Sequence, residues 1–130
     1  MQTLKFIFIV GSSRSGTTMM SRVLANHSDV HTFGELHFFS QIFSKQKKIK
    51  LEYLDALNIL SELFKRQRYG LFSKKEASDF LDLSKKILIK KSYKILEVFR
   101  FFVEYELKET QKKIACFHTP NNIYYIDEIQ

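Results

Sequence analysis

The stretch that decides the fold runs from residue 6 to residue 18 and reads Phe6-Ile-Phe-Ile-Val-Gly-Ser-Ser-Arg-Ser-Gly-Thr-Thr18. Its apolar start, Phe6 to Val10, predicts a buried strand. Gly11 then opens a polar loop that ends at Gly16, and a helix is expected to begin at Thr17. Backbone N–H groups of such a loop and of a first helical turn can bind phosphate or sulfate oxygens. The stretch therefore predicts an anion site between a strand and a helix.

The two glycines have the spacing of the nucleotide P-loop pattern G-x-x-x-x-G-K-[ST], but Thr17 stands where that pattern has Lys. The only cation of the loop is Arg14. Its guanidinium can hold two oxygens of one anion at once, which an ammonium does less well. The same spacing also fits a plain strand-to-helix turn that binds no ligand, so this alternative stays open.

The loop Gly11-Ser-Ser-Arg-Ser-Gly-Thr-Thr18, followed by Leu24-Ala-Asn-His-Ser-Asp-Val30, resembles the PAPS-dependent sulfotransferases. These enzymes take their sulfuryl group from 3′-phosphoadenosine 5′-phosphosulfate (PAPS). Ser28 stands where the family often has Pro. The resemblance implies that the loop holds the 5′-phosphosulfate and that Arg14 contacts its bridging and transferred groups. It implies further donor contacts from Ser13, Ser15, Gly16, Thr17 and Thr18.

A second match is Glu35-Leu-His-Phe-Phe39, which looks like the acidic segment after the first helix in several of these enzymes. The family's Glu is the proposed catalytic base, because a hydroxyl that attacks sulfur must give its proton to a nearby acceptor. Glu35 and His37 are two residues apart, so on an extended segment they share a face and His37 would orient Glu35 or assist it. The resemblance thus implies Glu35, Arg14 and His37 as catalytic residues. A solvated Glu35 and a capping His37 are the alternative.

A third match lies near the end, where Lys113-Ile-Ala-Cys-Phe117 predicts a short strand before His118-Thr-Pro120. The turn is similar to a Lys-Thr-Pro turn that the family places beside the donor. Here His118 replaces the Lys, and a neutral imidazole carries no fixed charge near pH 7. Thr119 as N-cap and Pro120 as first helical residue explain the same turn without any ligand. Both interpretations can hold together.

These elements predict an α/β fold, a P-loop-type parallel sheet flanked by helices, with the ligand at the carboxyl ends of the strands. We expect strands at 4–10 and 113–117, a loop or short strand at 29–35, the start of a helix at 36–44, and helices at 16–26, 51–66, 74–90, 92–110 and 121–129. The helix from 74 rests on the capping-box pattern Ser73-Lys-Lys-Glu76, and Tyr69-Gly70 should end the helix before it.

Apolar stripes at three- and four-residue steps support two of the helices. One stripe is Leu51, Leu54, Leu57, Leu60, Leu63 and Phe64, and the other is Ile95, Phe99, Phe102, Val103 and Leu107.

The 130 residues fit one domain. The family's 3′-phosphate site uses a later strand followed by basic and hydroxyl residues, and nothing in this sequence supplies it. We therefore expect residues 1–130 to be the N-terminal part of a single sulfotransferase-like domain, incomplete at the C-terminus. Alone, this part should bind PAPS weakly and should not catalyse transfer.

The net charge of +7 favours anionic partners. The lysine clusters at 45–50, 74–75, 85–86, 90–91 and 112–113 are interpreted as solvated helix faces, and no nucleic-acid-binding motif accompanies them. Cys116, the single cysteine, is expected in the core. We expect no metal and no membrane span, and a cytoplasmic location, because the apolar start is too short for a signal sequence.

The function that the resemblance implies is transfer of a sulfuryl group from PAPS to a hydroxyl or amine acceptor on a small molecule, glycan or peptide. A P-loop nucleotide kinase or NTPase is an alternative, although it would need the Lys that is missing at position 17. A non-catalytic remnant that keeps only the loop is a second alternative. The acceptor and the oligomeric state stay open.

Overall fold

The computed structural model describes residues 4–10 and 16–129. The elements follow in the order β1 (Lys5–Phe8), α1 (Thr17–Ala25), β2 (Val30–Thr32), the π-helical turn η1 (Phe38–Phe43), α2 (Tyr53–Tyr69), the 3₁₀ helix η2 (Ala77–Phe80), α3 (Leu81–Ile87), α4 (Ile95–Thr110), β3 (Ile114–Phe117), the 3₁₀ helix η3 (Pro120–Tyr125) and α5 (Ile126–Ile129). The predicted α/β class is confirmed.

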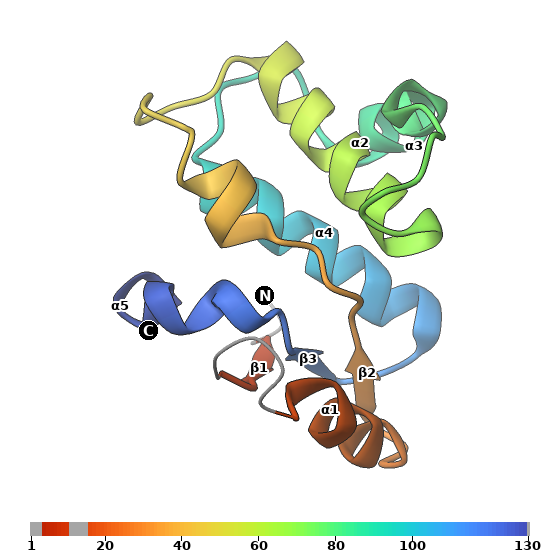
Figure 1. Cartoon of the computed structure of the whole chain (residues 1–130). Helices are drawn as coiled ribbons and strands as arrows, with labels where there is room; N and C mark the ends of the chain where they lie inside the picture. Colours follow the sequence, from red (N-terminus) through yellow and green to blue (C-terminus); the bar gives the residue numbers. More distant parts are fainter. Residues whose placement is uncertain (1–3, 11–15, 130) are drawn as a thin grey trace.

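The sheet has three parallel strands in the order β1-β3-β2. In the central strand, β3, Cys116 pairs with Ile7 of β1 on one side and with Thr32 of β2 on the other. Within the segment at 29–35, Val30–Thr32 forms the short strand β2, and residues 33–35 continue as a loop. Helices α4 and α1 lie on opposite faces of the sheet, and α2 packs on the far side of α4 (Figure 1). The sheet is thus covered on both faces, as a parallel sheet requires.

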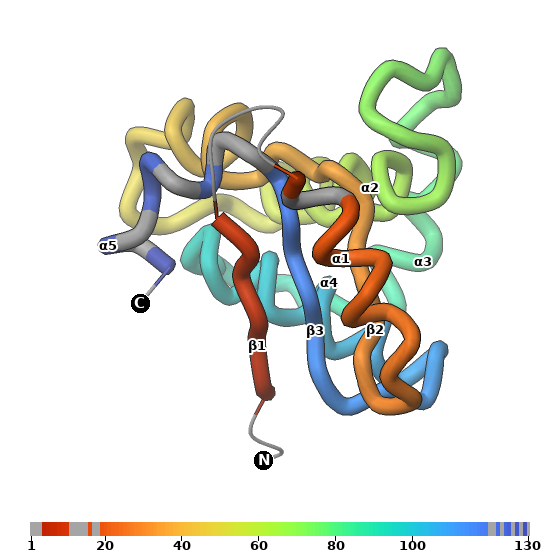
Figure 2. The backbone as a smooth tube through the Cα atoms, turned by 60° about the horizontal axis from the view of Figure 1, so that its bottom comes forward, coloured from red at the N-terminus to blue at the C-terminus, as the bar shows by residue number. Residues whose placement is uncertain are grey.

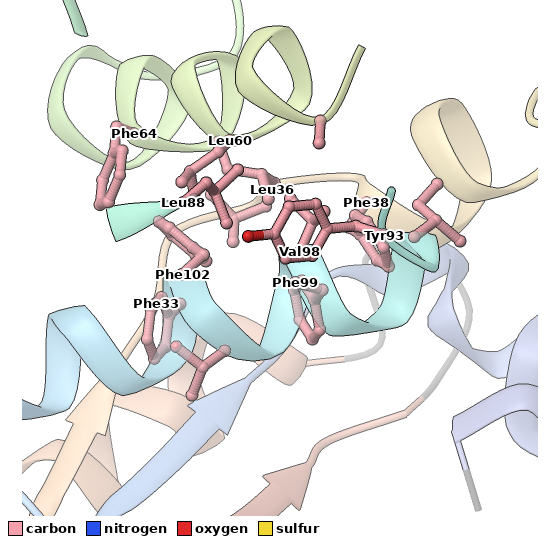
Figure 3. Packing of buried hydrophobic residues seen from close by; sticks show 14 of the residues in the cluster. Phe33, Leu36, Phe38, Leu60, Phe64, Leu88, Tyr93, Val98, Phe99 and Phe102 are labelled. Atoms are coloured by element: carbon pink, nitrogen blue, oxygen red, sulfur yellow. The ribbon is translucent and has the colours of Figure 1, made fainter. Parts of the chain in front are cut away.

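The core lies between the sheet, α4 and α2, and it is built largely from phenylalanine rings (Figure 3). The predicted stripe of α4 is confirmed, since all five of its members belong to this core. Cys116 is fully buried, as expected. Its burial raises the pKa of the thiol, while a hydrogen bond with Thr32 acts in the opposite direction. The thiol is therefore a packed core group.

The prediction of a helix at 74–90 is wrong for the first half of this segment. The hydroxyl of Ser73 accepts a hydrogen bond from the Lys75 amide at 3.1 Å, which is a local turn and not a capping box. The chain then forms η2 and only afterwards α3. A serine that bonds to its own neighbouring backbone competes with helix formation, which explains the delay. The last predicted helix likewise begins as the 3₁₀ helix η3 before α5.

Two further expectations about surfaces are corrected. Leu54 is 69% exposed and does not join the core. It lies in the first turn of α2, outside the buried face of this helix. The lysine clusters are helical only at 85–86, in α3. The clusters at 45–50, 74–75, 90–91 and 112–113 lie in turns and loops. Gly70 ends α2 with a φ of 88°, as predicted.

A buried acid–base pair joins β2 to α4. The imidazole Nε2 of His31 lies 3.9 Å from a carboxylate oxygen of Glu106, and their side chains are only 18% and 11% exposed. Burial lowers the pKa of His31 below its ordinary 6.5, with Lys112 adding to the effect. Burial raises the pKa of Glu106 above its ordinary 4.5, against an opposing effect of Arg68. Since both shifts favour the uncharged forms, desolvation outweighs the mutual attraction.

We predict that Glu106→Gln stabilises the fold at pH 8 by about 1 kcal/mol, the usual size of a single-residue effect. A raised folded-state pKa means that the folded protein loses stability as pH rises above the ordinary value of 4.5. Gln resembles the protonated acid and avoids this loss, so the gain should shrink as pH falls toward 4.5. Chemical denaturation at several pH values measures it. Glu104→Gln, an exposed carboxylate on the same helix, should change stability little, and a destabilised Glu106→Gln at pH 8 would contradict the prediction.

Candidate functional site

The N-terminus of α1 carries the first part of the site. Gly16 precedes the helix with a φ of 93°, a left-handed conformation that glycine adopts without strain. The first intrahelical hydrogen bond runs from the Met20 amide to the Gly16 carbonyl at 3.1 Å. The earlier amides of the helix have no acceptor within it, the described residues provide no side-chain cap, and the sequence of the first turn has no acidic residue. This helix end therefore suits an anion.

The remaining loop residues of the predicted donor site, Ser13, Arg14 and Ser15, lie outside the described residues. Thr17 and Thr18 open α1, and the structure describes their backbone only. The predicted contacts of these side chains with the donor stay predictions. The strand expected before these residues and the helix expected after them are confirmed as β1 and α1.

The strand register brings the other predicted segments to the same edge of the sheet. Beyond the paired strands, the Ile9 amide bonds to the Phe117 carbonyl at 2.8 Å, and the Phe33 amide bonds to the Cys116 carbonyl at 2.9 Å. Because all three strands run in parallel, they end together beside the N-terminus of α1 (Figure 2). His118 and Glu35 directly follow these ends, as expected of a ligand edge in an α/β sheet.

The segment from Phe33 to His37 is held on both sides of Glu35. Phe33 is fully buried and stacks on Phe117 with ring centroids 4.5 Å apart. Leu36 is 2% exposed. Two side chains of α2 hold the backbone: Gln67 Oε1 accepts from the Gly34 amide at 3.0 Å, and Arg66 donates to the Leu36 carbonyl at 2.7 Å. The segment therefore presents Glu35 from a fixed backbone.

Glu35 and His37 lie together, as their spacing predicted. Nε2 of His37 is 3.6 Å from a carboxylate oxygen of Glu35, with side chains 15% and 44% exposed. His37 has a φ of 52°, which a non-glycine residue rarely adopts and which favours a positional role. Its Nδ1 is buried and has no hydrogen-bond partner among the described residues. The carboxylate of Glu35 is thus partly exposed to solvent, and the mostly buried imidazole of His37 lies next to it.

His118 is 7% exposed, and its Nδ1 also has no partner among the described residues. Thr119 and Asn122 beside it are equally buried polar residues, which the sequence analysis did not single out as a group. The sequence analysis also missed Arg66 and Gln67, because no local pattern links α2 to a segment thirty residues earlier.

Within the described ranges, no group of three His, Cys, Asp or Glu side chains could hold a metal ion. No described helix is long and apolar enough to cross a membrane.

Comparison with known protein families agrees with the geometry. The chain matches the model of the Sulfotransferase family over residues 7–130, and it belongs to this family. The match begins inside β1 and includes the anion loop, the Glu35 segment and the His118 turn. No curated protein and no solved structure matches the chain.

We predict that Gly16→Ala destabilises the protein by about 1–3 kcal/mol, the cost of holding a side chain in a rare backbone conformation. The cause is the φ of 93° alone, because an added Cβ would meet nothing within 4 Å among the described residues. Thermal or denaturant unfolding measures the effect.

Gly34→Ala is the matched control. Its Cβ would lie 3.7 Å from Gln67 Oε1, an ordinary contact, and its φ is not positive. We expect a change within about 0.5 kcal/mol. Equal losses from the two alanines would show that the conformation of Gly16 is not the constraint.

Proposed function

We propose that this protein transfers a sulfuryl group from PAPS to a hydroxyl or amine group of a small molecule, glycan or peptide. Membership of the sulfotransferase family makes sulfuryl transfer the parent activity. The single observation that carries the proposal further is the Glu35–His37 pair at the carboxyl edge of the sheet, the edge where α1 begins and where the described residues provide no side-chain cap. An anion-binding helix end next to a supported carboxylate is the arrangement that this reaction requires.

In the proposed reaction, the acceptor oxygen forms a bond to sulfur while the bond from sulfur to the 5′-phosphate oxygen breaks. The acceptor proton passes to the carboxylate of Glu35. The charge left on the phosphate is stabilised by Arg14 and by the free amides at the start of α1. His37 is a positioning residue, because it lies beside the carboxylate and is itself mostly buried. PAPS supplies the activated sulfuryl group, and Ser13, Ser15, Gly16, Thr17 and Thr18 complete its 5′ site.

We predict that Glu35→Gln, tested in a chain that also carries the expected 3′-phosphate segment, leaves donor binding unchanged and lowers the rate of sulfation by about 10²–10⁴-fold, the usual contribution of a general base. Gln keeps the size of the side chain and loses its basicity. The rate is followed with radiolabelled PAPS and a panel of hydroxyl and amine acceptors, and donor binding by calorimetry with adenosine 3′,5′-bisphosphate.

His37→Asn distinguishes support from catalysis. We expect it to lower the rate less than Glu35→Gln, since the carboxylate stays in place but loses its neighbour. If Glu35→Gln transferred sulfuryl groups within a few-fold of wild type, the base would be another group.

We predict that Arg14→Ala weakens binding of adenosine 3′,5′-bisphosphate by roughly ten- to a hundredfold, because a charge-assisted contact contributes about 1.5–3 kcal/mol. Arg22→Ala is the control, since Arg22 is exposed in the last turn of α1, at the other end from the anion site. Titration calorimetry with this ligand and with ATP–Mg²⁺ also separates the alternatives. In a chain that also carries the expected 3′-phosphate segment, preference for ATP–Mg²⁺ would indicate a nucleotide kinase or NTPase, and binding of neither ligand would indicate a remnant; both results would overturn the proposal.

A further inference from the structure

Two lysine-rich loops that are far apart in the sequence lie side by side. Leu51 and Tyr93 form an isolated antiparallel bridge, with hydrogen bonds of 2.7 and 3.0 Å between their backbones. The bridge joins the segment before α2 to the segment before α4, as Figure 1 shows. We call residues 45–50 and 89–94 together the lysine patch. Neither segment belongs to the candidate site.

Buried residues within and beside the two loops anchor the lysine patch to the core. Leu51, Leu88 and Tyr93 are each at most 2% exposed and belong to the core, where Figure 3 labels two of them. The Tyr93 hydroxyl closes its own loop, since it donates to the Ile89 carbonyl and accepts from the Ile89 amide, both at 3.0 Å. The loops are therefore shaped by buried contacts, and the Lys91 ammonium lies 5.0 Å from the centroid of the Tyr93 ring.

The charge of the patch is of one sign. Its lysines are all exposed, and neither loop contains an acidic residue; the lysines are Lys45, Lys47, Lys48, Lys50, Lys90, Lys91 and Lys94. The antiparallel bridge sets Lys50 opposite Lys94, a pairing of like charges that costs stability. Among the described residues, no ion pair neutralises any of these ammonium groups. Such an arrangement favours an anionic partner.

Apolar side chains stand among the lysines. Ile49 is 86% exposed and Ile89 is 69% exposed, although Leu88, directly before Ile89, and Leu51, two residues after Ile49, are buried. Leu54, in the first turn of α2, is 69% exposed as well. Exposed branched aliphatic groups gain nothing in water, but they gain free energy when they enter the boundary between lipid headgroups and acyl chains.

We propose that the lysine patch docks the protein on the surface of a bilayer that contains anionic lipids. The lysines meet the headgroups, and Ile49 and Ile89 enter the interface between them. Nucleic acid fits less well, because single-strand recognition uses aromatic stacking and isoleucine offers none. The combination of like charge and protruding aliphatic groups is what distinguishes a lipid surface from a soluble polyanion.

Vesicle flotation tests the proposal. Wild-type protein is mixed with phosphatidylcholine vesicles with and without phosphatidylserine, and binding is expected only to the anionic ones. Lys90→Glu/Lys91→Glu should lower partitioning at least about tenfold, since each lysine near an anionic surface contributes roughly fivefold. Lys47→Glu/Lys48→Glu provides an independent test from the other loop, with circular dichroism to confirm folding of each variant.

Two further variants make the test decisive. Lys74→Glu/Lys75→Glu changes the net charge by the same amount, but these residues follow the C-terminus of α2, whereas the lysine patch lies before its N-terminus. This variant should partition to anionic vesicles much more like wild type. Ile49→Ser/Ile89→Ser should lower vesicle binding by about tenfold while leaving binding of single-stranded RNA unchanged. Equal losses from the 74–75 and 90–91 reversals would show attraction by net charge alone. Unchanged vesicle binding by the isoleucine variant, or tighter binding of RNA than of anionic vesicles, would overturn the proposal.

Discussion

The packing of the sheet against its covering helix depends on the ring of Phe117, at the end of the central strand. It lies 5.1 Å from the ring of Phe8 on β1, 4.5 Å from Phe33 after β2 and 5.4 Å from Phe99 on α4. One side chain thus fixes two neighbouring strands and the main covering helix. Aromatic pairs of this kind contribute about 0.5–1.5 kcal/mol each beyond the area they bury. Because Phe33 begins the segment that carries Glu35, the candidate site inherits its position from this cluster.

The two halves of the candidate site have different physical origins. The N-terminus of α1, the proposed anion end, depends on local geometry: a glycine with positive φ precedes the helix, and the described residues provide no side-chain cap. The Glu35 half depends on distant residues, since Arg66 and Gln67 of α2 hold the backbone around it. A change in the packing of α2 would therefore move the carboxylate without touching the helix end.

The sequence predicted the local parts well. The apolar run that begins at Phe6 predicted β1, and the glycine before Thr17 predicted the start of α1. The spacing of Glu35 and His37 predicted that their side chains lie together. The strand order, the support from α2 and the meeting of the two lysine loops were not predictable, because each depends on residues at least thirty positions apart. The helix expected from Ser73 failed because a local turn used the hydroxyl first. The role of Arg14 stays a prediction.

The strand order has a consequence for how the protein is made. The central strand is the last of the three along the chain, and among the described strands β1 and β2 pair only with it. While the ribosome synthesises residues 33–113, both outer strands and the phenylalanines around them must wait for Ile114–Phe117 before the sheet can close. Contacts between residues so far apart in the sequence form slowly, and apolar surface stays exposed until they form. The nascent chain should therefore depend on chaperones more than a helical protein of the same length.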